Sequence, residues 1–190
     1  MMKIILASQS PRRSALLKLM GLEFDTQAAD IDETMDLALD PAVEVARVSR
    51  EKALAIPAKH NTLVIAADTI VVCDGHILGK PQSPQQAVEM LHMLSGKQHQ
   101  VMTGFTVRMG DMERTHTEIS TISFRTLLPE EIQAYVATGE PMDKAGAYGI
   151  QGMGALFVSG LEGDYYNVMG LPVCALTECL RGFGVKILGV

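Results

Sequence analysis

The chain has 190 residues, of which 47% are hydrophobic, and a formal net charge of −6. This is enough apolar material for one substantial core, so we expect a single domain spanning residues 1–190. The acidic balance argues against broad binding to nucleic acid or to acidic membranes, and no apolar run approaches the roughly 20 residues of a membrane span. The first residues lead directly into a short predicted strand and do not have the pattern of a signal peptide. The three cysteines form no Cys-x-x-Cys pair. Together, these observations predict a cytoplasmic protein.

Short apolar runs alternate with segments of helical periodicity, which predicts an α/β fold. The expected strands are Lys3–Ala7, Leu63–Cys73, Gln98–Met109, Glu113–Arg125 and Ala155–Leu161. The expected helices are Pro11–Met20, Pro41–Ala58, Pro84–Leu94, Pro129–Thr138 and Pro172–Phe183. Several begin at or near a proline, whose missing N–H costs nothing in the first helical turn. Gly110 and Asp111 predict the turn of a long hairpin.

The first expected strand leads into a polar turn and a helix that begins with two arginines. Ser8, Ser10, Arg12 and Arg13 lie there, beside the free N–H groups of the helix start. Hydroxyls, backbone N–H groups and two guanidinium groups together favour a phosphate ligand. Taken alone, the segment is equally consistent with a capped helix that carries two solvated arginines.

Glu33 and Lys52 are the next charged candidates along the chain. Glu33 lies in the acidic segment 30–34, which by itself is typical of a solvated loop or a cap. Lys52 is expected on the second helix, beside an apolar face that contains Ala53 and Leu54. A lysine beside such a face can extend its ammonium group into a cleft, although most helical lysines only keep a surface hydrated.

Asp68 follows the apolar run Leu63–Ala67 and is the strongest candidate for chemistry. We expect its carboxylate at the carboxyl end of a buried strand, where ligands bind in α/β sheets. There it can hold a divalent cation or orient an attacking water. The alternative is an aspartate that merely ends the strand in a turn.

Two further lysines lie next to glycines. Lys80 stands between Gly79 and Pro81, so a rigid turn would hold its charge for a phosphate. Lys144 precedes a series of spaced glycines, which allow a close approach to a ligand but also serve in plain tight turns. The sequence contains no P-loop, no dinucleotide-binding glycine fingerprint and no histidine pattern typical of a zinc site.

Four blocks of the sequence, in order, resemble the signature motifs of the Maf family of nucleoside triphosphate pyrophosphatases. They are Leu6–Arg13, Ala66–Val72 with the following Gly75, Gly79, Lys80 and Pro81, then Lys144–Gly152, and finally Tyr165–Pro172. Each block alone is a weak signal, but their order and number make chance agreement very unlikely. The resemblance extends from about Lys3 to Arg181.

The resemblance implies an elongated, twisted mixed sheet flanked by helices, with two lobes around a substrate cleft, often in a homodimer. It implies hydrolysis of a nucleoside triphosphate to a monophosphate and pyrophosphate with Mg²⁺ or Mn²⁺. The implied catalytic residues are Asp68, Glu33, Lys52 and Lys80, of which Asp68 and Glu33 would hold the metal. The implied substrate-binding residues are Ser8, Ser10, Arg12, Arg13, Thr69, Lys144 and Gln151.

Three positions indicate the base. The resembling subgroup with Arg12, Thr69 and Gln151 is associated with dTTP and UTP, and a sister group with Trp, Gln and Glu at these places is associated with 7-methyl-GTP. The Gln151 amide offers both a donor and an acceptor to the uracil or thymine edge, whereas a glutamate only accepts. The alternatives are a 7-methyl-GTP-type enzyme, a hydrolase of another anhydride such as a nucleotide sugar, and a non-catalytic nucleotide-binding regulator of septum formation.

Overall fold

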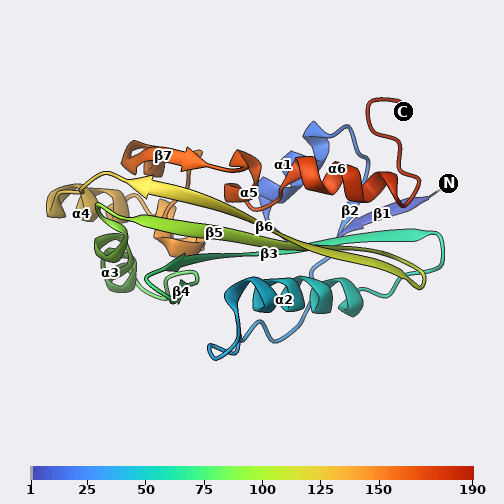
Figure 1. The fold of residues 1–190 in the computed structure, drawn as a ribbon, viewed down its shortest axis with the longest axis horizontal. Coiled ribbons are helices and arrows are strands. Elements are labelled where there is room, and N and C mark those ends of the chain that lie inside the picture. Colours follow the sequence, from blue (N-terminus) through green and yellow to red (C-terminus); the bar gives the residue numbers. More distant parts are fainter. Residues whose placement is uncertain (1) are drawn as a thin grey trace. The chain divides into compact units, whose positions relative to one another are not determined.

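The computed structural model describes residues 2–190 and contains a seven-stranded mixed sheet with helices (Figure 1). The strand order is β2-β1-β3-β5-β6-β7, and β4 pairs with β3 outside this path. The strands are β1 (Lys3–Leu6), β2 (Asp25–Thr26), β3 (Thr62–Cys73), β4 (His76–Leu78), β5 (Gln98–Met109), β6 (Met112–Phe124) and β7 (Val158–Glu162). The predicted α/β class is confirmed.

Five of the six α-helices in residues 2–190 begin at or next to a predicted proline, whereas the short helix Tyr165–Val168 was not predicted. The helices are α1 (Pro11–Leu19), α2 (Pro41–Ala55), α3 (Pro84–Leu94), α4 (Pro129–Ala137), α5 (Tyr165–Val168) and α6 (Val173–Arg181), with short 3-10 helices η1 (Glu140–Asp143), η2 (Ala145–Ala147) and η3 (Met153–Phe157). The N-cap side chains of α1, α2, α3 and α5 accept a backbone hydrogen bond, such as Asp40 from the Ala42 N–H at 2.7 Å and Ser83 from the Gln86 N–H at 3.2 Å.

The structure corrects the boundaries of three predicted elements by more than one residue. Helix α2 ends at Ala55 and not at Ala58, because Pro57 disfavours a helical conformation of the preceding Ile56, which is extended. Helix η3 occupies the start of the last predicted strand, and β7 begins only at Val158. Helix α6 begins one residue after Pro172, which is its N-cap, and ends at Arg181.

The contacts between residues in space divide the chain into two compact units. Unit 1 comprises Met1–Asp68, Thr103–Glu118 and Gly170–Val190, and unit 2 comprises Thr69–Met102 and Ile119–Met169. The strands β3, β5 and β6 therefore contribute residues to both units.

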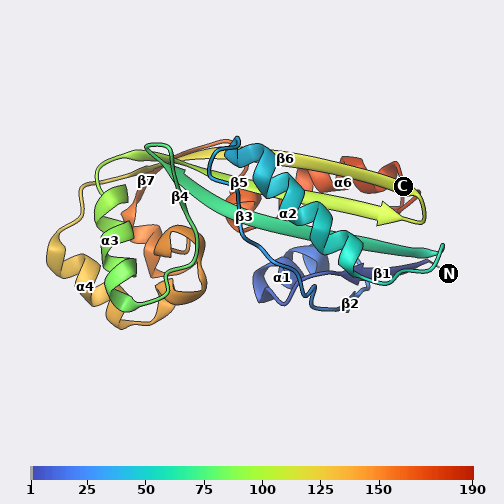
Figure 2. The ribbon, with the colours of Figure 1, turned by 90° about the horizontal axis from the view of Figure 1, so that it is seen from below.

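Within unit 1, β1 pairs in parallel with both β2 and β3. Helix α2 runs along the strands of this unit (Figures 1 and 2), and its residue Ala53, together with Ile56 just after the helix, packs with buried Val64 and Ala66 of β3. The contact is close because β5 has a glycine there: a Cβ at Gly104 would lie 2.5 Å from the carbonyl oxygen of Val45. The sequence thus places α2 directly against the main chain of the sheet.

Within unit 2, α3 packs against α4 and η2 over a larger apolar core. This core includes aromatic side chains in edge-to-face contact, such as Phe124 with Tyr148 at 4.7 Å between ring centroids and Tyr135 with Phe157 at 5.0 Å. Strand β7 pairs antiparallel with β6 at the end of the strand order. None of the helices found in the described part of the chain is long and apolar enough to cross a bilayer.

Candidate active site

The turn between β1 and α1 has the predicted strand–turn–helix form. Ser8 is buried, and its hydroxyl oxygen accepts a hydrogen bond from the Ser10 N–H at 3.1 Å. Ser10 is the N-cap of α1, and its hydroxyl accepts from the Arg13 N–H at 3.5 Å. Pro11 opens the helix, so this helix start combines backbone donors with two hydroxyl groups.

Arg13 is held by contacts on two sides. Its Nε donates to the carbonyl oxygen of Gly170 at 2.8 Å, and its Nη1 donates to the Ser8 hydroxyl at 3.3 Å. The pKa of Arg13 is lowered, chiefly because burial disfavours the charged guanidinium, and nearby Arg12 acts in the same direction. The carboxylates of Asp68 and Glu33 oppose this shift, which means that both influence the Arg13 charge. Arg13 is therefore a fixed cation of the site and also a tie between α1 and the Gly170 segment.

Lys52 connects the two predicted carboxylates. Its side chain extends from α2 and is only 7% exposed, which agrees with the prediction of a lysine beside the apolar helix face. Its Nζ lies 2.7 Å from Asp68 Oδ1 and 3.0 Å from Glu33 Oε1. A buried ammonium is stable only when such partners compensate its lost hydration. The three residues therefore form one charged cluster, the Lys52 cluster.

Asp68 does not lie where the sequence suggested. We expected it at the carboxyl end of a buried strand, but Asp68 lies in the middle of β3, which ends at Cys73 as predicted. The strand continues because Val71–Cys73 pair with β4, which the sequence analysis missed. The pairing of β1 with β3 nevertheless stops at Ile65, so Asp68 lies just beyond the end of the neighbouring strand. Ligands of α/β sheets bind beyond the carboxyl ends of strands, and the strand end that lies next to Asp68 is that of β1 and not that of β3.

Hydrogen bonds fix α2, and with it Lys52, to the strands of unit 1. Ser49 shares a hydrogen bond of 2.9 Å with Thr106 on β5, which shares another of 2.9 Å with Thr115 on β6. Near the helix start, the Thr117 hydroxyl donates to the Ala42 carbonyl oxygen at 3.0 Å. These bonds satisfy buried hydroxyl groups and fix the helix along the strands.

Arg12, next to Arg13 on α1, is half-buried and belongs to unit 1, and the remaining candidates belong to unit 2. Thr69 follows Asp68 on β3 and is half-buried, and Lys80 and Gln151 are exposed. Lys144 is ordered locally: its Nζ donates to the Glu140 carbonyl oxygen and to Asp143 Oδ1, both at 2.7 Å. The structure thus brings together Glu33, Lys52 and Asp68 in unit 1, and it gives Lys144 a fixed position in unit 2.

Tyr135 and Glu140 hold the segment that carries Gln151, and the sequence analysis did not identify either of them. The Tyr135 hydroxyl donates to Glu140 Oε1 at 2.9 Å and accepts from the Gly149 N–H at 3.2 Å. The Glu140 carboxylate accepts from the N–H groups of Met153 at 3.0 Å and Gly154 at 3.3 Å. These bonds fix the chain on both sides of Gln151.

Gly152 is necessary for this arrangement, because a Cβ at that position would collide with the Glu140 carboxylate. Burial and the neighbouring Glu140 charge raise the pKa of Tyr135, so its hydroxyl stays protonated and can donate. The signal in the sequence was the spacing of Glu140 before the glycine series, but a pattern of glycines does not say which carboxylate they accommodate.

The Lys52 cluster fits a divalent cation. Mg²⁺ is commonly held by one or two carboxylates together with phosphate oxygens of the substrate, and Asp68 and Glu33 converge on one nitrogen atom. Among residues 2–190 there is no group of three or more His, Cys, Asp or Glu side chains that could hold a metal by itself. Asp68 and Glu33 are therefore the residues that could hold a cation together with phosphate oxygens of a ligand.

The fold defines a class of proteins. A solved Ham1 protein of Staphylococcus aureus superposes with a TM-score of 0.52 at 15% identity, covering 95% of this chain and 99% of the other. A HAM1 protein of Coxiella burnetii gives a TM-score of 0.50 at 14% identity, covering 96% and 100%. At this identity the likeness establishes a common fold.

The sequence matches the Maf-like protein family over residues 3–183, and the chain belongs to this family. It is 51% identical to a dTTP/UTP pyrophosphatase of Moorella thermoacetica, over 100% of this chain and 99% of that protein. It is also 47% identical to a dTTP/UTP pyrophosphatase of Bacillus pumilus, over 97% and 98% of the two chains. The family predicted from the four sequence blocks is confirmed.

Proposed function

We propose that this chain is a nucleoside triphosphate pyrophosphatase that hydrolyses dTTP and UTP to the monophosphate and pyrophosphate. The observation that carries the proposal is the Lys52 cluster, with Asp68 at 2.7 Å and Glu33 at 3.0 Å from one buried ammonium, in a chain 51% identical to a dTTP/UTP pyrophosphatase. Such a cluster is costly as a stability device, because each charge must be desolvated. It is well suited to a polyphosphate and its cation.

In the proposed reaction, a water oxygen forms a bond to the α-phosphorus, and the bond from that phosphorus to the α,β-bridging oxygen breaks. Asp68 accepts the proton of the water, and the pyrophosphate leaves with the electron pair of the broken bond. Lys52 and Arg13 neutralise the charge that develops on the phosphate oxygens. Mg²⁺ or Mn²⁺, held by Asp68 and Glu33, would lower the pKa of the water and polarise the phosphate.

The other candidates would bind substrate. Ser8, Ser10 and the N–H groups at the start of α1 suit phosphate oxygens, together with the guanidinium of Arg12. Lys80 and Lys144 would add positive charge for the same phosphates. Gln151 would donate to O4 and accept from N3–H of uracil or thymine, and Thr69 would complete the base preference.

The acidic chain, with a net charge of −6, is not suited to nucleic acid, so the proposed partner is a free nucleotide. We further propose a cytoplasmic homodimer. Sedimentation of the purified chain tests the dimer, because a single species of 20.5 kDa would contradict it. Fractionation of the native cells tests the compartment.

The test of the reaction is a panel of nucleotides with Mg²⁺ or Mn²⁺, with separate detection of pyrophosphate and orthophosphate. We expect equal amounts of UMP and pyrophosphate from UTP, equal amounts of dTMP and pyrophosphate from dTTP, and little reaction with CTP, GTP or 7-methyl-GTP. Release of orthophosphate, or a preference for a nucleotide sugar, would contradict the proposed reaction. Tight binding of UTP without turnover would indicate a regulator.

A further inference from the structure

Glu33 lies in a segment without regular structure. Residues 27–40, between β2 and α2, form no helix or strand, and the Glu33 side chain is 53% exposed. A half-exposed carboxylate on such a segment would ordinarily lose much of its order to conformational entropy. Its distance of 3.0 Å to Lys52 therefore needs a cause outside the ion pair itself.

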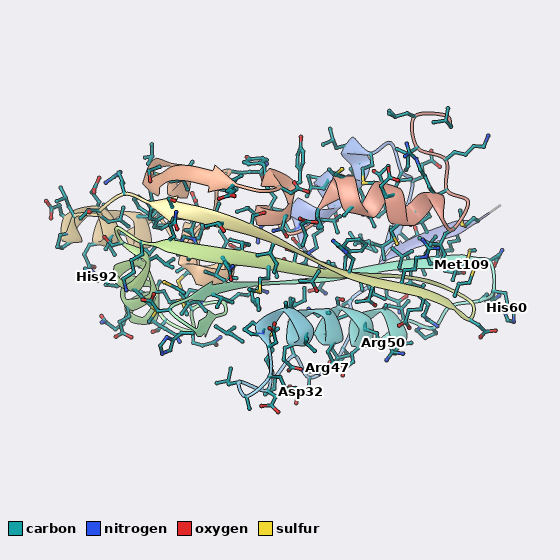
Figure 3. The ribbon with its side chains drawn as sticks, in the orientation of Figure 1. Asp32, Arg47, Arg50, His60, His92 and Met109 are labelled. Atoms are coloured by element: carbon teal, nitrogen blue, oxygen red, sulfur yellow. The ribbon has the colours of Figure 1, made fainter. Side chains whose placement is uncertain are left out.

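Arg47 supplies one part of that cause. This residue of α2 donates from Nη2 to the carbonyl oxygen of Thr34 at 2.8 Å, next to Glu33 in the chain. The same guanidinium donates to both carboxylate oxygens of Glu44 at 2.9 Å and to Glu51 Oε1 at 2.8 Å. Figure 3 labels Arg47 on the helix and Asp32 in the segment beside it.

Glu44 supplies the other part. It is only 1% exposed, and its Oε2 accepts from the Asp36 N–H at 2.7 Å. The Arg47 and Asp36 hydrogen bonds hold the pKa of Glu44 below its usual range, so it stays an acceptor. The pair thus anchors two points of the segment, the Thr34 carbonyl and the Asp36 N–H, to one helix.

A local turn transmits this anchoring to Glu33. Asp32 Oδ1 accepts from the Thr34 N–H at 2.9 Å and from the Thr34 hydroxyl at 2.6 Å, which closes the chain around Glu33. Lys52 follows Arg47 on the same helix. The helix that carries the ammonium therefore also fixes the segment that carries its carboxylate partner.

We propose that Arg47 and Glu44 are positioning residues that set Glu33 relative to Lys52 and Asp68, and so set the carboxylate pair for its cation. This rests on the role of Glu33 in the proposed function. Ordinary pairing along a helix surface explains the Arg47–Glu51 contact, which joins positions i and i+4. It does not explain the bonds to Thr34 and Asp36, because those atoms belong to a different part of the chain.

The experiment compares Arg47→Met with Glu51→Gln. Both variants lose the Arg47–Glu51 ion pair, but only Arg47→Met also loses the bonds to Thr34 and to Glu44. We expect Arg47→Met to lower kcat and to raise the Mg²⁺ concentration for half-maximal activity, each by about tenfold or more, as for other residues that orient ligands. The KM for UTP should change little. For Glu51→Gln, the kcat, the Mg²⁺ concentration for half-maximal activity and the KM for UTP should all stay close to those of the parent chain.

Glu44→Gln provides a second variant if Arg47→Met folds poorly, as thermal unfolding would show. It keeps the side-chain volume and an oxygen that can accept from the Asp36 N–H, but it removes the negative charge that strengthens the hydrogen bonds from Arg47. We expect the same changes in kcat and Mg²⁺ dependence, at a smaller size.

Combination with Glu33→Gln shows whether Arg47 acts through Glu33. If it does, Arg47→Met should have almost no further effect in the Glu33→Gln chain. Equal effects of Arg47→Met in both chains would overturn the inference and leave the proposed function intact. A Glu33→Gln chain with normal turnover would overturn both the inference and the role of Glu33.

Discussion

The two units hold their candidate residues by different means. In unit 1, Lys52, Asp68 and Glu33 are joined by direct ion pairs of 2.7 and 3.0 Å, and Arg13 adds a second cation. In unit 2, the segment around Gln151 is held through its backbone N–H groups, which donate to Tyr135 and Glu140 beside an aromatic core. One arrangement fixes charges, and the other fixes a main-chain path.

This difference corresponds to two physical tasks. An ammonium and carboxylates that are held in direct ion pairs are already in place as charged groups. When a phosphate and a cation bind, the ammonium can pair with the phosphate and the carboxylates with the cation. Backbone hydrogen bonds to neutral or locally compensated groups change little with ligand charge, so they suit the shape and the donor pattern that recognise a base. This difference is consistent with the proposed roles of the first arrangement in the chemistry and of the second in the base preference.

Asp68→Asn should have the largest effect, because it changes the charged arrangement of unit 1 and leaves the arrangement of unit 2 intact. The amide keeps the size and one acceptor oxygen, but it removes the charge that faces Lys52 and the proton acceptor. We expect kcat to fall about a hundredfold or more, with a folded chain by circular dichroism. Asp74→Asn, which removes an exposed ion pair between Lys97 and Asp74 just beyond the end of β3, is the matched control and should leave turnover almost unchanged. Near-normal activity of Asp68→Asn would exclude it as the proton acceptor.

Gln151→Glu should alter selectivity and not the chemistry. The ionised carboxylate offers only acceptors, so the O4 atom of uracil loses its donor, at a cost of about 1–3 kcal/mol, or roughly tenfold to a hundredfold in kcat/KM. The exposed Gln133→Glu on α4 controls for the added charge. Measurement of kcat/KM for UTP, dTTP, CTP, GTP and 7-methyl-GTP tests this. An unchanged rank order with all substrates slowed alike would refute the assignment.

Tyr135→Phe should loosen the segment without touching the Lys52 cluster. It removes the donor to Glu140 and the acceptor for the Gly149 N–H, and each lost bond costs about 1 kcal/mol. We expect Tm to fall by several degrees and the preference for UTP over CTP to narrow a few-fold, while kcat for UTP changes less. Tyr165→Phe, at an exposed position, is the control. A lower Tm with an unchanged UTP/CTP ratio would make Tyr135 purely structural.

His99 gives the smallest effect and concerns the core of unit 2. Burial lowers its pKa to about 4, and its Nε2 lies 2.8 Å from the Tyr148 hydroxyl. Between pH 6.5 and about 4 the unfolded chain binds a proton that the folded chain does not, so stability falls as the pH is lowered through this range.

The slope for one such proton is at most about 1.4 kcal/mol per pH unit. Urea unfolding at several pH values should show a shallower dependence for His99→Gln than for the parent chain. His92→Gln, at the exposed position labelled in Figure 3, should keep the full dependence. Equal slopes in all three chains would contradict the low pKa.

The sequence predicted most of the regular elements because their determinants are local. Prolines and capping side chains mark the starts of α1, α2 and α3, and the strand Gln98–Met109 has the predicted bounds. The strands β2 and β4 were not predicted, because a segment of two or three residues is too short to show a periodic pattern. They exist through pairing with β1 and β3, which is not a local property.

The candidate site divides in the same way. The resemblance indicated Asp68, Lys52 and Glu33, and the apolar face of α2 indicated that Lys52 could be buried. Neither indicated Arg47, Glu44, Tyr135 or Glu140. Their partners are backbone atoms many residues away, and a carbonyl oxygen or an N–H group is the same in every sequence, so no residue pattern reveals these bonds.

Gly104 has a consequence for redesign of this protein. Because α2 rests on β5 through main-chain atoms at Gly104, the helix and the strand approach each other more closely there than any residue with a Cβ would allow. A single methyl group added at position 104 would act as a spacer under the helix and lift the lysine away from its carboxylates.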